Sequence, residues 1–101
     1  MTPTENLLHI ERIKKLKYEY WRACDAKDPQ GFRRCFTKHG SSIDYGALGV
    51  TDADGMVEVF RRIALQKDES GHRILDMHHG FHPDITLIGD TEATGRCILP
   101  Q

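Results

Sequence analysis

The chain has 101 residues, 29% of them charged, and a net charge of −1, which fits one small globular domain. The balanced charge argues against a nucleic-acid-binding protein, because phosphate binding normally needs an excess of Lys and Arg. No apolar run approaches the ~20 residues that span a bilayer, and the N-terminus lacks the features of a signal peptide. Three cysteines without C-x-x-C spacing favour reduced thiols. We therefore expect a soluble, cytoplasmic domain with no nucleic-acid or membrane partner.

The first predicted element is a long amphipathic helix from Thr4, a candidate N-cap, to about Ala26. Its apolar positions recur every three or four residues and are Leu7, Ile10, Ile13, Leu16, Tyr20 and Cys24. Asp28–Pro29 then starts a short second helix, since proline suits the first helical turn. The basic and glycine residues of Lys38–Gly40 end this helix.

The middle of the chain predicts a short strand followed by a third helix. Ser41 to Tyr45 is the strand, and a glycine-containing loop runs from it to Val50. Thr51 or Asp52 caps the helix, which continues to about Gln66. Its amphipathic pattern rests on Met56, Val59, Phe60 and Ile63.

The last third of the chain predicts extended structure. Lys67 to Gly71 is a polar loop, and the strands after it are Arg73 to His79, Asp84 to Ile88 and Glu92 to Leu99. Pro83 cannot donate to a strand ladder, so we expect a bulge or a break there. Gly89–Thr91 forms a hairpin turn. Helices first and strands last predict an α+β fold.

The end of the first helix holds one candidate site. Tyr20 belongs to the apolar stripe, so its ring faces inward and its hydroxyl needs a polar partner. Asp25 lies at the helix C-terminus, where a carboxylate opposes the helix dipole. It either orients a histidine or simply caps the turn into Asp28–Pro29, and the spacing leaves both interpretations open.

The second candidate is the histidine-rich segment Met77 to His82. On a strand, His78 and His79 point to opposite faces, and His82 lies too far from His78 to share one ion. We therefore expect no metal site. A single inward histidine beside a carboxylate is the better functional picture, because imidazole exchanges protons near neutral pH and the carboxylate fixes its tautomer.

With these residues in place, the sequence resembles the SnoaL-like branch of the nuclear transport factor 2-like superfamily. The matching segments are Ile13 to Asp25, Ile43 to Gly46, Asp54 to Arg62, Met77 to Ile85 and Gly89 to Arg96. The resemblance implies a cone-like half-barrel, in which three N-terminal helices pack on a curved, mostly antiparallel sheet around an apolar pocket. Family members usually continue with further strands, so residues 1–101 are expected to form a single, C-terminally short domain with an incomplete cone.

The pattern looks closest to dehydratases of the bile-acid and scytalone type. By that resemblance His78 is the general base, Asp25 orients it, and Tyr20 hydrogen-bonds the substrate oxygen. Neither a cofactor nor a metal is implied. The aromatic residues expected to contact the substrate are Tyr45, Trp21, Phe60 and Phe81.

The functional hypothesis is a dehydratase (lyase) or isomerase acting on a small hydrophobic, steroid- or polyketide-like molecule. The alternatives are a binding module without catalysis, or an inactive, truncated SnoaL-like protein. A further alternative is an interaction domain that binds a partner through an open sheet edge. The resemblance further implies a homo-oligomer, either a dimer or a trimer.

Overall fold

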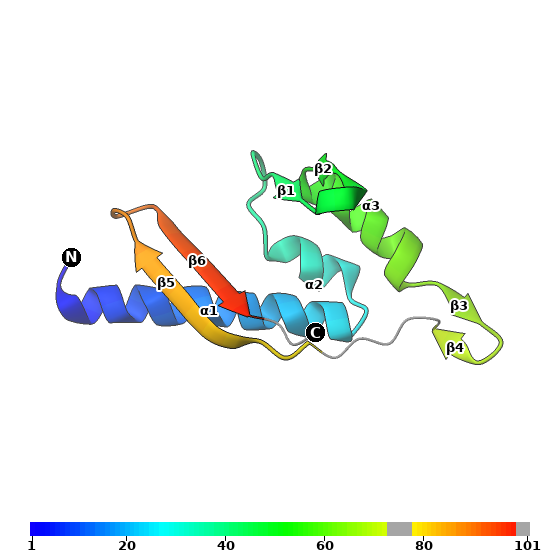
Figure 1. Cartoon of the computed structure of the whole chain (residues 1–101), viewed down its shortest axis with the longest axis horizontal. Helices are drawn as coiled ribbons and strands as arrows, with labels where there is room; N and C mark the ends of the chain where they lie inside the picture. Colours follow the sequence, from blue (N-terminus) through cyan, green and yellow to red (C-terminus); the bar gives the residue numbers. More distant parts are fainter. Residues whose placement is uncertain (73–77, 99–101) are drawn as a thin grey trace.

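The computed structural model describes residues 1–72 and 78–98 (Figure 1). Three α-helices are followed by short antiparallel strands, which confirms the predicted α+β class. The helices are α1 (Pro3–Asp25), α2 (Pro29–Arg34) and α3 (Ala53–Ala64), and η1 (Gly46–Leu48) is a single 3₁₀ turn. The strands are β1 (Ile43–Asp44), β2 (Val50–Thr51), β3 (Lys67–Asp68), β4 (Gly71–His72), β5 (Phe81–Leu87) and β6 (Ala93–Ile98).

Each α-helix begins at a side chain that accepts a hydrogen bond from the first turn. The Thr2 hydroxyl caps α1 by accepting from the Glu5 N–H at 3.1 Å, so the predicted cap at Thr4 is wrong by two residues. Pro3 occupies the first helical position, where proline is favoured, and this moves the helix start forward. Asp28 caps α2, which begins at the predicted Asp28–Pro29, and Asp52 rather than Thr51 caps α3.

The core lies where the C-terminal half of α1 meets α2 and α3. Its centre is Phe32, which is 1% exposed and whose ring centroid lies 5.0 Å from that of Phe60 and 5.3 Å from that of Tyr20. The buried hydrophobic side chains are Trp21, Ala23, Cys24, Phe32, Ala53, Met56, Val57 and Phe60. Of these, Ala23 and Cys24 pack with Phe32 and with Met56, Val57 and Phe60 in one cluster, which fixes the end of α1 and therefore the position of Asp25.

The strands form separate antiparallel pairs, β1–β2, β3–β4 and β5–β6. The β3–β4 pair stands where a polar loop was predicted, and β2 falls at the end of a predicted loop. Of the predicted strand Arg73 to His79, residues 73–77 lie outside the described residues, while His78 and His79 are not in a strand. The sheets are small and unclosed, as an incomplete half-barrel requires.

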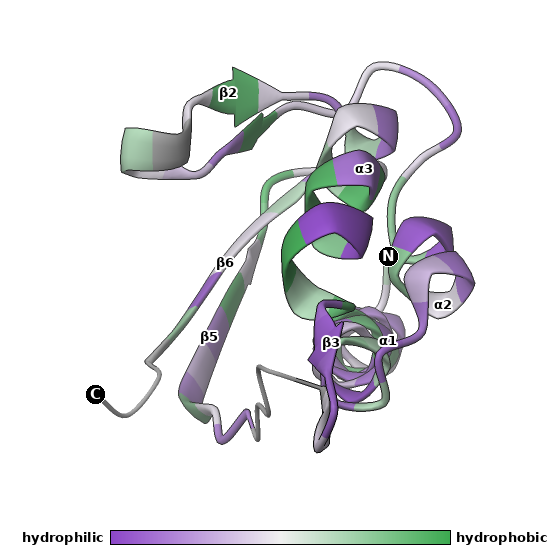
Figure 2. Ribbon diagram, turned by 90° about the vertical axis from the view of Figure 1, so that its right-hand side faces the viewer, coloured by the Kyte–Doolittle hydropathy of each residue, from purple (hydrophilic) through white to green (hydrophobic). Residues whose placement is uncertain are grey.

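The β5–β6 hairpin lies beside α1 (Figure 1). Its register pairs Ile85 with Gly95, and a register shift falls between Phe81 and Asp84. His82, inside this shift, has a positive φ of 53°. The irregularity confirms the bulge predicted around Pro83. Seen nearly along α1, the hairpin and α2 lie on opposite sides of that helix (Figure 2).

Candidate functional site

Asp25, the last residue of α1, contacts His78 across a sequence separation of 53 residues. The Nδ1 atom of His78 lies 2.5 Å from Asp25 Oδ1. The backbone N–H of His78 also donates to both carboxylate oxygens, at 3.1 Å to Oδ1 and 3.0 Å to Oδ2. One carboxylate therefore holds both the ring and the main chain of His78, and these bonds offset its unfavourable place at the helix C-terminus.

The hydrogen bonds from His78 keep Asp25 ionised. Burial acts to raise the pKa of the Asp25 carboxyl, but the ring and backbone hydrogen bonds of His78 together outweigh it, so the pKa falls below its ordinary value of 3.8. The Asp25 carboxylate thus accepts a hydrogen bond from His78 Nδ1 in the ring tautomer that carries its proton on this nitrogen. In this tautomer Nε2 carries the free lone pair.

His78 lines a small cavity of about 170 Å³ between the helices. The same cavity is lined by Tyr20 of α1, by Phe60 of α3 and by Tyr45, which precedes η1, with mostly apolar neighbours. Burial, followed by the proximity of Cys24 and Tyr45, raises the pKa of the Tyr20 hydroxyl. The phenol is therefore protonated at neutral pH and can donate a hydrogen bond into this cavity.

The structure thus brings together four of the residues predicted for the site, Tyr20, Tyr45, Phe60 and His78, with Asp25 bound to His78. Trp21 and Phe81 are placed differently. The Trp21 ring packs directly on Gly80, where an added Cβ would lie 1.9 Å from Cη2 of the indole. Phe81 is 52% exposed. Among the described residues, it lines neither this small cavity nor a second, larger cavity that is described next.

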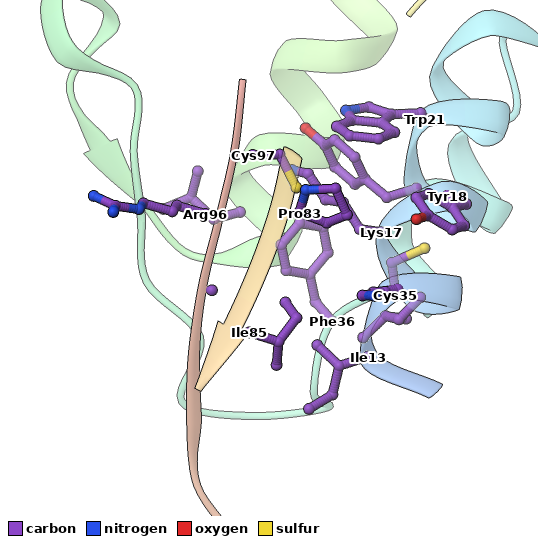
Figure 3. A pocket seen from close by; sticks show the side chains of 15 residues that line it. Ile13, Lys17, Tyr18, Trp21, Cys35, Phe36, Pro83, Ile85, Arg96 and Cys97 are labelled. Atoms are coloured by element: carbon purple, nitrogen blue, oxygen red, sulfur yellow. The ribbon is translucent and has the colours of Figure 1, made fainter. Parts of the chain in front are cut away.

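The larger cavity, of about 470 Å³, lies between α1 and the β5–β6 hairpin (Figure 3). Ile13 and Trp21 line it from α1, Phe36 from the segment after α2, and Ile85 from β5. Tyr20 lines both cavities. The family resemblance implied an apolar pocket between the helices and the sheet. Of the residues that line the larger cavity, Tyr20 and Trp21 were predicted for the site from the sequence, and the others were missed.

The remaining histidines of the segment, His79 and His82, are exposed. Within residues 1–72 and 78–98, no three His, Cys, Asp or Glu side chains come together in a way that suits a metal ion. Among the helices that the structure describes, none combines the length and the apolar character needed to cross a membrane.

A family model described as a SnoaL-like domain matches residues 5–99. The chain belongs to the SnoaL-like domain family. Its resemblance to the nuclear transport factor 2-like superfamily is thereby confirmed. Comparisons of this SnoaL-like domain with curated proteins and with solved structures found no match. SnoaL-like domains bind small molecules, which agrees with the presence of two cavities on either side of Tyr20.

Proposed function

We propose that this SnoaL-like domain is a cofactor-independent dehydratase or isomerase for a small hydrophobic molecule of steroid or polyketide type. The observation that carries the proposal is the 2.5 Å contact between His78 Nδ1 and Asp25 Oδ1, made by a histidine that also lines an aromatic cavity. A histidine whose far nitrogen is fixed by a carboxylate is the usual arrangement of a general base. The carboxylate also stabilises the imidazolium that forms when the base takes a proton.

In the proposed mechanism, Nε2 of His78 removes an acidic proton from the carbon next to a substrate carbonyl. The electron pair of the broken C–H bond moves into an enolate, and the Tyr20 hydroxyl donates a hydrogen bond to its oxygen. In a dehydration, the His78 imidazolium then protonates a β-hydroxyl group, which leaves as water as the conjugated double bond forms. In an isomerisation, the imidazolium returns the proton to a different carbon. Protons and electrons balance without an external reactant.

A binding module without catalysis is the second candidate, and the larger cavity favours it. Its described lining residues include neither His78 nor Asp25, so a ligand there would not touch the proposed base. Homo-oligomerisation and a cytoplasmic location stay predictions in either case.

The test is an ultraviolet assay for a new conjugated double bond, run on a panel of β-hydroxy ketones that includes steroids and aromatic polyketides. His78→Ala should lower turnover by about 10² to 10⁴ while leaving substrate binding in place, the range expected for loss of a general base. His79→Ala, at an exposed neighbouring position, is the matched control and should keep full activity. Unchanged turnover in His78→Ala would refute the mechanism, and binding without turnover across the panel would favour the second candidate.

A further inference from the structure

The described charged residues that line the larger cavity are all positive. The charged members of its described lining are Lys14, Lys17 and Arg96, with no carboxylate among them. Lys14 is paired with Glu11 at 3.2 Å, and Arg96 lies 3.7 Å from Asp84. Figure 3 also shows the Arg96 guanidinium pointing away from the other lining side chains. Lys17 is therefore the cation at this cavity that has no carboxylate partner among the residues that the structure describes.

Two aromatic rings hold the ammonium group of Lys17 near the cavity. Its Nζ atom lies 4.5 Å from the ring centroid of Tyr20 and 5.3 Å from that of Trp21. Both distances are within the range of cation–π attraction. Since Tyr20 and Trp21 also line the cavity, these contacts place the charge of the exposed Lys17 at the edge of the cavity.

The rest of the cavity is apolar and of ligand size. Ile13 and Ile85 lie on facing walls, with Phe36 between α1 and the hairpin (Figure 3). The Ile85 side chain occupies the space beside Gly95, where an added Cβ would lie 2.7 Å from Ile85 Cδ1. The volume of about 470 Å³ falls within the ~300 to 1,000 Å³ typical of small-molecule sites.

We propose that the cavity between α1 and the β5–β6 hairpin is a binding site for an apolar carboxylate. The hydrocarbon part of the ligand lies between Ile13, Phe36 and Ile85, and its carboxylate pairs with Lys17. The single ammonium group of Lys17 matches the one negative charge of a carboxylate head group. The site does not depend on the proton chemistry of His78, so it stands or falls separately from the proposed function.

The first test compares decanoate with decanol, which have the same chain and differ in charge. Trp21 is the only tryptophan in the sequence and lines the cavity, so its fluorescence reports binding directly. At neutral pH and low salt, decanoate should bind about tenfold more tightly than decanol, the gain expected for one charge-assisted pair. Equal affinities, or no effect of either compound on Trp21, would overturn the proposal.

The second test locates the preference at one side chain. Lys17→Met should abolish the preference for decanoate and leave decanol binding unchanged, because the apolar walls remain. Lys15→Met is the matched control, since Lys15 is exposed on the same helix and is not among the lining residues. If both variants lose the preference to the same extent, the attraction comes from the general charge of α1 and the proposed site is wrong. His78→Ala should bind decanoate as the unchanged protein does.

Discussion

The helical part of the molecule and the β5–β6 hairpin are built on different principles. All the buried hydrophobic side chains of the described structure belong to α1, α2 and α3. The inward-facing side chains of the hairpin, such as Ile85 and Cys97, are only half-buried, and the larger cavity separates them from α1. We therefore expect the helices to supply most of the stability, while the hairpin leaves room for a ligand. Asp25 and His78 lie where the two regions meet.

The largest expected effect on stability is at the centre of the helical core. Phe32→Ala removes the side chain at the centre of the core and should lower the free energy of unfolding by about 3 to 4 kcal/mol, the usual loss for a buried phenylalanine. Chemical denaturation followed by far-ultraviolet circular dichroism measures this change. For so small a domain, the loss leaves little net stability.

Ile85→Ala in the hairpin is the counterpart. Since Ile85 is half-buried beside a cavity, its truncation should cost about 1 kcal/mol, well below the loss at Phe32. A loss equal to that of Phe32→Ala would show that the hairpin contributes as much to stability as the helices, contrary to this expectation.

Gly80→Ala tests the contact between the two regions. The new methyl group would lie 1.9 Å from the Trp21 ring, so the segment that carries His78 must move away from α1. We expect a loss of about 2 kcal/mol, in the range of overpacked sites, together with a changed Trp21 emission and lower turnover. Gly89→Ala, where an added Cβ meets nothing within 4 Å, is the control and should change none of these.

Asp25→Asn tests the contact that joins the helical part to the segment before β5. Because the pKa of Asp25 is lowered in the folded state, its charge stabilises the fold above the unfolded carboxyl's pKa of about 3.9, and this contribution is lost as the pH falls toward the folded pKa. At pH 7 the variant should be less stable by about 1 kcal/mol, a modest value because both partners are partly exposed.

The pH dependence distinguishes this effect from a simple structural defect. The stability difference between the unchanged protein and Asp25→Asn should shrink as the pH falls below about 4, where the Asp25 carboxylate gains its proton. Unfolding curves at each pH measure it. Asp90→Asn, in the exposed turn between β5 and β6, should show no such change. A difference that stays constant down to pH 2 would mean that the Asp25 charge does not stabilise the fold.

The sequence predicted the three helices better than the strands, although α2 ends at Arg34 and not at the predicted Lys38–Gly40. The three α-helices follow an apolar spacing of three and four residues, and two of their caps, Asp28 and Asp52, are visible in the sequence. The β3–β4 pair could not be predicted, because strands of two residues are too short to show alternation, and the polar segment Lys67 to Gly71 resembles a loop. The bulge near Pro83 was predicted because proline lacks the N–H that a ladder needs.

The site was predictable only in part. The stripe of α1 places Tyr20 inward, but spacing alone cannot pair Asp25 with a histidine 53 residues away, and the family resemblance supplied that pairing. Trp21 was expected to contact the substrate on which His78 acts. The packing of Trp21 on Gly80 could not be predicted from the sequence, because a glycine has no side chain whose pattern indicates what it contacts.

The contact between Asp25 and His78 also has a consequence for the order of folding. It closes a loop of 53 residues, which costs more chain entropy than the local contacts that join α1 to α2. We expect the helical core to form first and the carboxylate to bind His78 only after the main barrier is crossed. Asp25→Asn should then speed unfolding while leaving the refolding rate nearly unchanged.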